Sequence, residues 1–181
     1  MSLFIAMLLA NPGPPSAEKI GFSVVGSGMV SSAQSETLLL CRKEKDFRKA
    51  LEEMGITGEF AWPTDLKKGA VIIAFLGKRP TGGYSIEPLS VYRVDYNSSH
   101  ASWKQMWQEG IIPLLEADGI DPDAVPTADI EKVGDAVVVT KEICPDPGKM
   151  NIQMFTSPFV IIAVPGYSLK EVHVRIVRCS G

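Results

Sequence analysis

Histidine and cysteine are scarce in this chain, and their scarcity limits the chemistry that it can carry out. Its 181 residues include two histidines, His100 and His173. A hydrolytic nucleophile needs a base and an orienting group beside it, and no serine stands in a Gly-x-Ser-x-Gly turn. The glycine-rich segment 77–83 is not a phosphate-binding loop, because its lysine precedes the loop rather than following it. The sequence therefore predicts no catalytic residues, and we expect that the protein is not an enzyme.

The three cysteines, Cys41, Cys144 and Cys179, stand too far apart to form a CxxC motif for a metal or a redox centre. An odd count excludes complete intramolecular pairing, but it allows either one disulfide or three free thiols. The favoured interpretation is that all three are small, buried or half-buried hydrophobic side chains. The sequence indicates no cofactor, and this interpretation includes no metal site.

An excess of positive charge is also missing. Lysine and arginine number 18 against 21 aspartates and glutamates, so that the net charge is −3 and the pI is about 5.4. A mildly acidic chain has no electrostatic attraction for nucleic acid or for anionic lipid. We therefore expect no nucleic-acid partner.

Long apolar runs are lacking as well. The run at residues 3–10 is too short to cross a bilayer, and we expect no transmembrane segment. It precedes Asn-Pro-Gly-Pro-Pro and resembles the end of a signal peptide, although no lysine or arginine stands before it. We assign residues 1–19 to a leader or a disordered N-terminus, and residues 20–181 to a single domain.

What the sequence does contain is a series of apolar, β-branched segments. Hydrophobic residues make up 45% of the chain and charged residues 22%, which is ordinary for one globular domain. Residues 70–76 (AVIIAFL) are almost wholly apolar and predict a buried central strand. Residues 84–95 alternate and predict a second strand, joined to the first as a hairpin through the turn at 77–83. Further strands are expected at 21–32, 36–42, 134–143, 152–164 and 172–177.

A helix is predicted over residues 43–54, because Phe47, Leu51 and Met54 recur at spacings of four and three on one face. Packed on a sheet of about six strands, this helix gives an α+β fold. We therefore predict a single β-rich domain, mainly an antiparallel sheet with one packed helix.

Residues 97–132 differ from their surroundings and predict a partly helical insertion. A short helix is expected from a cap at Ser98 or Ser99 to about residue 109, ended by Gly110 and Pro113. Its apolar face would carry the set Trp103, Met106 and Trp107. That face either docks the helix on the sheet, which we favour, or offers the two tryptophans as a stacking platform.

The stretch Phe75-Leu-Gly-Lys-Arg-Pro-Thr-Gly-Gly-Tyr-Ser-Ile86 resembles the signature of the PrcB C-terminal domain family. The motif RPTGGYSI at 79–86 is followed in the expected order by TSPFVIIAVP at 156–165, which resembles the closing strand of the family. The core resemblance covers residues 70–96 and 133–165. The family passes almost directly between these two parts, so the insertion 97–132 is a departure from its pattern.

The resemblance implies a modest function. PrcB is the small subunit that accompanies and stabilises a subtilisin-like surface protease, and it is not the catalytic subunit. The resemblance thus implies a non-catalytic protein-binding module that associates with or stabilises a secreted or surface protease in a bacterium. It also implies an extracytoplasmic location, and the family offers no catalytic residues to carry over.

The turn within the motif has properties that suit a binding surface. Pro80 fixes φ, the hydroxyl of Thr81 can cap the turn, and Gly82 and Gly83 permit positive φ. Tyr84 offers a flat apolar ring with a polar tip, as many interface residues do. The other interpretation is a simple tight turn whose tyrosine packs on the sheet. The candidate partner-binding residues are Arg79, Pro80, Thr81, Gly82, Gly83 and Tyr84.

Two further functions are weighed as alternatives. The loop 79–84 is somewhat similar to the Asn-Pro-Thr-Thr-Gly-Tyr loop of chagasin-type cysteine protease inhibitors, although the companion Arg-Pro-Trp segment is missing. The insertion could instead bind a small ligand or Ca²⁺ through its acids, whose spacing does not match an EF-hand; a solvated acidic loop is the favoured interpretation. These acids are Asp118, Asp121, Asp123, Asp129 and Glu131.

Overall fold

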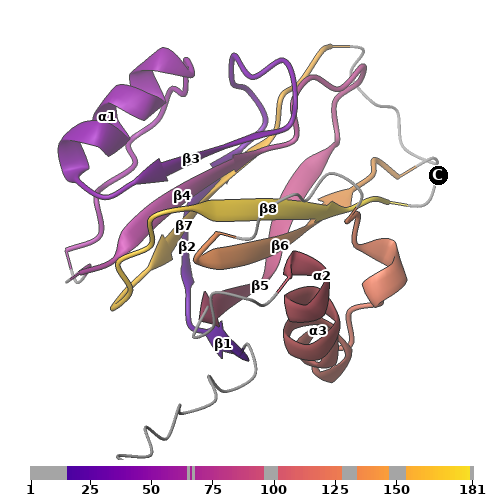
Figure 1. The fold of residues 1–181 in the computed structure, drawn as a ribbon. Coiled ribbons are helices and arrows are strands. Elements are labelled where there is room, and N and C mark those ends of the chain that lie inside the picture. The colour runs from indigo at the N-terminus through magenta and orange to yellow at the C-terminus, as the bar shows by residue number, and fades with distance from the viewer. Residues whose placement is uncertain are drawn as a thin grey trace, which may run out of the picture.

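The computed structural model describes residues 16–64, 66, 68–95, 102–127, 134–146 and 154–179. Two four-stranded sheets face one another (Figure 1). Sheet A has the strand order β1 (Ser16–Ile20), β5 (Ser85–Asp95), β6 (Ala136–Ile143) and β8 (Val172–Val177). Sheet B has the order β2 (Ser23–Gly28), β7 (Phe159–Val164), β4 (Ala70–Phe75) and β3 (Thr37–Cys41). All pairings are antiparallel except that of β6 with β8, which is parallel.

The predicted α+β class and the β-rich single domain are confirmed, but the strands form two sheets rather than one. Every residue of β4 and of β7 is buried. Strands that are apolar on both faces need a covering layer on each side. In sheet B, one face is covered by sheet A and the other by a helix. A second helix, from the insertion, covers the outer face of sheet A, so the structure has four layers.

The predicted hairpin of residues 70–76 with 84–95 is wrong. β4 pairs with β3 and β7, whereas β5 pairs with β1 and β6. The chain leaves sheet B at Gly77. Its φ of 71° is a left-handed conformation that glycine adopts readily and other residues rarely do. A Cβ there would lie 2.5 Å from the backbone of Ser35, so the close approach also requires glycine. Residues 77–84 are therefore a connection between the two sheets and not the turn of a hairpin.

The first strand begins inside the segment that the sequence analysis assigned to a leader. β1 pairs antiparallel with β5 from Ser16, opposite Asp95, to Ile20, opposite Val91. Residues 16–19 thus belong to the folded domain, and residues 1–15 lie outside the described part of the chain.

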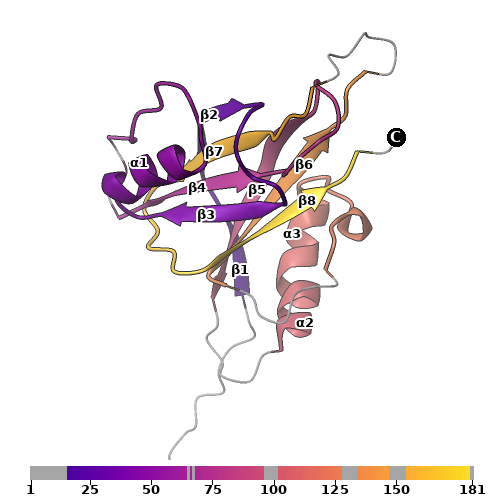
Figure 2. The same cartoon turned by 90° about the horizontal axis from the view of Figure 1, so that it is seen from above.

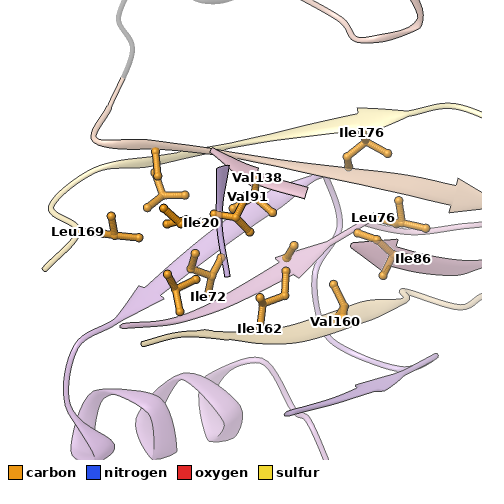
Figure 3. Packing of buried hydrophobic residues seen from close by; sticks show 14 residues of the cluster. Ile20, Ile72, Leu76, Ile86, Val91, Val138, Val160, Ile162, Leu169 and Ile176 are labelled. Atoms are coloured by element: carbon orange, nitrogen blue, oxygen red, sulfur yellow. The ribbon is translucent and has the colours of Figure 1, made fainter. Parts of the chain in front are cut away.

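The core between the sheets is built from branched aliphatic side chains (Figure 3). Ile72 and Ile162 of sheet B meet Val91 and Val138 of sheet A, and all four are fully buried. Burial of apolar surface stabilises the folded state by about 25 cal/mol per Å² removed from water. This free energy holds the two sheets together.

The helix predicted at 43–54 is confirmed as α1 (Glu44–Glu53), which lies on the outer face of sheet B (Figure 1). Phe47 and Leu51 are buried against that face. Gly55, with φ of 60°, follows the helix end in the left-handed conformation that favours glycine. Within the described residues, no helix has the length and apolar character needed to cross a membrane.

The helix predicted in the insertion is longer than expected. It begins with α2 (Trp103–Gln105), capped by the hydroxyl of Ser102, which accepts a hydrogen bond from the Gln105 N–H. It continues through a π-helical segment, η1 (Met106–Ile111), into α3 (Ile112–Ala117). A short 3₁₀ turn, η2 (Pro122–Ala124), follows. Ser98 and Ser99, the predicted caps, lie outside the described residues.

Gly110 and Pro113, which were predicted to end this helix, lie within it. Pro113 occupies the first turn of α3, where a missing N–H is tolerated. A Cβ on Gly110 would lie 3.0 Å from Met106 Sδ and 3.3 Å from Ala17 Cβ, so glycine lets the helix approach β1 closely. Met106 is fully buried on the outer face of sheet A and Trp107 is 6% exposed, as the docking interpretation predicted.

A half-buried carboxylate connects the end of this helix to sheet A. Asp118 accepts hydrogen bonds of 2.6 Å from Lys19 Nζ, Ser90 Oγ and Tyr92 Oη. Burial alone would raise the pKa of the Asp118 carboxyl, but these three donors outweigh burial and lower it to about 2. Burial, and then the hydrogen bond to Asp118, raise the pKa of Tyr92, so its hydroxyl stays protonated as a donor.

We predict that Asp118 makes the stability of the protein fall in acid. A lowered carboxyl pKa stabilises the folded state above the ordinary value of 3.8, and this contribution is lost as the pH falls toward 2. Asp118→Asn should lower the free energy of unfolding at pH 7 by about 2 kcal/mol, measured by urea unfolding from pH 2 to 7. It should also flatten the acid slope, whereas Asp123→Asn, at an exposed position, should leave it unchanged. An unaltered slope in Asp118→Asn would contradict this account.

Candidate functional site

The loop 79–84 is fastened to the segment that precedes β7. The Arg79 N–H donates to the Thr156 carbonyl at 2.7 Å, and the Thr156 N–H donates to the Arg79 carbonyl at 3.1 Å. The Thr156 hydroxyl also donates to the carbonyl of Thr81 at 3.1 Å. The two motifs that carry the resemblance, 79–86 and 156–165, therefore meet in space.

Four charged side chains pair with one another and form what we call the charge cluster: Glu36, Arg79, Glu142 and Arg178. Arg79 Nε donates to Glu142 Oε1 at 2.5 Å, and Arg79 Nη2 lies 3.6 Å from Glu36 Oε1. Arg178 contacts the same two carboxylates, with Nη1 at 3.3 Å from Glu142 Oε2. The side chain of Glu142 is 7% exposed and that of Arg79 16%. Two cations thus neutralise two carboxylates, one of them buried.

The electrostatic balance of the cluster favours its charged form. Burial alone would lower the pKa of Arg178, but Glu36 and Glu142 outweigh burial and raise it. Each carboxylate is shared by two guanidinium groups, and such networks hold geometry better than single exposed pairs do. Arg79 is therefore an anchor of the loop, with its guanidinium occupied by protein carboxylates.

The remaining loop residues differ in exposure. Gly82 is buried, Pro80 and Gly83 are exposed, and Thr81 and Tyr84 are half-buried. Gly83 has φ of 92°, a conformation that strains other residues. The structure thus presents a tethered loop whose tip is at Pro80 and Gly83.

Four exposed apolar side chains, which we call the patch, lie on two joined segments next to this loop, and the sequence did not indicate them. Its four members are 43%, 58%, 51% and 64% exposed: Met29, Val30, Met154 and Phe155. The Ser157 N–H donates to the Met29 carbonyl at 2.9 Å, which joins the two segments. Lys78 Nζ lies 4.0 Å from the centroid of the Phe155 ring, next to the loop. Several exposed apolar side chains on adjoining segments are typical of a site of protein interaction.

Two of the three cysteines form a disulfide, which corrects the interpretation of three free thiols. Cys144 and Cys179 are bonded, with their Cα atoms 5.7 Å apart. The parallel pairing of β6 with β8 explains the bond, because the C-terminal ends of both strands lie side by side at the same end of sheet A. Cys41 is free and buried, and burial, reinforced by Asp46, raises the pKa of its thiol to about 11.

The acids of the insertion have other roles. The carboxylate of Asp118 binds three donors, and that of Asp121 accepts the N–H of Asp123 in a 3₁₀ turn. Asp129 and Glu131 lie outside the described residues. Across the parts of the chain that are described, no three His, Cys, Asp or Glu side chains gather as metal ligands would.

A groove of about 280 Å³ runs between β3 and β8, which lie side by side where the two sheets approach one another (Figure 2). His173 is half-buried in this groove, with its Nε2 atom 3.8 Å from Glu171 Oε1. Burial and then Arg175 lower the pKa of His173, while Glu171 opposes them. The other histidine, His100, lies outside the described residues.

Comparison of the chain with protein-family models, with curated proteins and with solved structures gave no match.

We predict that the contacts of Arg79 stabilise the loop 79–84 and the folded state. Arg79→Ala removes the closest cation from a buried carboxylate, and it should lower the free energy of unfolding by about 2–3 kcal/mol. Arg48→Ala is the matched control, because it breaks an exposed pair on α1 with Glu44 and should cost about 0.5 kcal/mol or less. Equal losses in urea unfolding of the two variants would contradict the role of Arg79.

Proposed function

We propose that this protein is a non-catalytic binding module that associates with and stabilises a secreted or surface protease of the subtilisin-like class. The observation that supports this proposal is the exposed apolar patch beside the loop 79–84. Four of the five large hydrophobic side chains that are exposed among the described residues belong to this patch. The protease class comes from the motif resemblance alone.

The chemistry of the patch suits a protein partner. Methionine and phenylalanine are enriched in the cores of protein interfaces, and Met29, Met154 and Phe155 are of this kind. Met side chains are adaptable, whereas the adjoining loop is held by backbone and charged contacts. A loop that is already fixed loses little conformational entropy on binding. The combination supports binding of a folded partner surface.

The tethering of the loop favours surface docking over insertion into a protease cleft. A loop that enters a cleft must project from its surroundings, but here Arg79 is bound to Glu142 and to the backbone of Thr156. The disulfide agrees with an extracytoplasmic location, where such bonds form and persist. We therefore propose association and stabilisation as the function, with inhibition as the outcome that would replace it.

The first test is a binding titration against a subtilisin-like protease and a papain-like protease, with residual activity and thermal half-life of the protease measured in parallel. We expect binding to the subtilisin-like enzyme, a longer half-life and little inhibition. Stoichiometric inhibition of either enzyme would replace the stabilising function by the inhibitor function. Absence of binding to both would overturn the proposal.

We predict that Phe155→Asp weakens this binding at least tenfold, because a charge replaces the most exposed apolar member of the patch and a tenfold loss corresponds to about 1.4 kcal/mol. Val24→Asp is the matched control, since Val24 is 53% exposed but lies on β2, outside the patch. Calorimetric titration measures both affinities, and circular dichroism checks the fold. An equal loss of affinity in the two variants would show that the patch is not the binding surface.

A further inference from the structure

The disulfide lies directly beside the charge cluster. Glu142 stands two residues before Cys144, and Arg178 immediately precedes Cys179. The covalent bond therefore restrains one carboxylate and one guanidinium of the cluster at the same time. β6 and β8 end together here, with Lys141 opposite Val177 in the parallel register.

A continuous series of contacts leads from the disulfide to the binding surface. Arg178 binds Glu142, and Glu142 accepts the hydrogen bond of Arg79 Nε at 2.5 Å. The backbone of Arg79 is paired with Thr156, the residue that follows Phe155 of the patch. The loop 79–84 and one arm of the patch are thus both connected to the position of Arg178.

We propose that the Cys144–Cys179 disulfide controls the order of the loop 79–84 and of the adjoining patch, so that its reduction by a dithiol weakens binding of the partner. The effect on partner binding rests on the proposed function, whereas the effect on loop order does not.

The reaction is a thiol–disulfide exchange. A thiolate of the dithiol attacks one sulfur of the bond, the S–S bond breaks, and a mixed disulfide forms while the other cysteine leaves as a thiolate. The second thiol of the reductant then displaces the first cysteine. Two electrons and two protons pass from the dithiol to the protein, which yields two cysteine thiols and one oxidised reductant. Cys144 and Cys179 are both half-buried, whereas Cys41 is buried.

Reduction breaks the covalent restraint on Arg178 and Glu142, and the ion pairs alone hold these two residues less firmly. Arg178 is 48% exposed, so solvent screens its attraction for Glu36 and Glu142. Arg178 and Cys179, which follow β8, gain conformational freedom once the covalent loop closed by the disulfide is open. Glu142, which is 7% exposed, then keeps Arg79 as its main counter-ion. Because Glu142 lies two residues before Cys144, its position is then restrained less, and the contact that anchors Arg79 and the loop 79–84 is loosened.

Hydrogen exchange measured by mass spectrometry tests the coupling without a partner. In the 181-residue chain, reduction with dithiothreitol and the variant Cys144→Ser/Cys179→Ser should each raise amide exchange over residues 79–86 about tenfold. Arg178→Gln keeps the disulfide but removes the ion pairs, and it should raise exchange about two- to fivefold, with partial rescue by Arg178→Lys. Cys41→Ser is the control and should leave exchange over 79–86 unchanged.

The same proteins are then titrated with the subtilisin-like protease, whose affinity should fall in the same order. Unchanged exchange over residues 79–86 in the reduced protein and in Arg178→Gln would overturn the coupling. If the double serine variant loses its fold by circular dichroism, Arg178→Gln decides, because its disulfide is intact. Faster exchange without any protease binding would support the coupling and would refute the proposed function and the regulation of binding.

Discussion

The rest of the structure depends on the burial of β4 and β7 on both faces. Neither strand has an exposed residue, so each side of sheet B must be covered. Sheet A covers one side through the aliphatic core, and α1 covers the other through Phe47 and Leu51. This requirement accounts for three of the four layers, and the helix of the insertion adds the fourth on the outer face of sheet A. The same requirement also separates β5 from β4, although the two strands follow one another in the chain.

The separation of β4 from β5 creates the candidate site. The connecting residues must cross from one sheet to the other, and their backbone finds a partner in Thr156 rather than in a hairpin. Arg79 then comes to lie against a carboxylate of β6, Glu142, and near Arg178 after β8. Segments 29–30 and 154–155 leave their apolar side chains exposed beside this crossing. A rigid loop beside an adaptable apolar surface is the physical basis of the proposed protein-binding function.

The sequence predicted the elements that depend on local pattern, such as the helix at 43–54 and the buried strand at 70–76. It failed where long-range pairing decides. The apolar run 70–76 and the alternating run 84–95 are compatible with a hairpin, and only the pairing of each run with other strands excludes it. Glycine and proline commonly end helices, so Gly110 and Pro113 predicted a helix end. The helix nevertheless continues through both, because Gly110 lies in a π-helical segment that packs closely on Ala17.

The candidate site was predicted in part for a similar reason. The loop 79–84 was visible as a motif, because proline and glycine mark turns locally. The patch was not, because Met29 and Phe155 are ordinary hydrophobic residues in the sequence, and exposure depends on how the sheets pack. The one available signal was the resemblance of the segment 156–165, which places Phe155 beside a motif. The disulfide likewise required knowledge that β6 and β8 are parallel neighbours.

The central claim is that the patch and the loop form one surface for a protein partner. The most direct measurement is hydrogen exchange of the protein alone and in complex with a subtilisin-like protease, compared peptide by peptide. The account predicts slower exchange on binding in the peptides that contain residues 29–30, 79–84 and 154–155, and unchanged exchange in β3 and β8. Protection confined to β3 and β8, around the groove that they line, would contradict it.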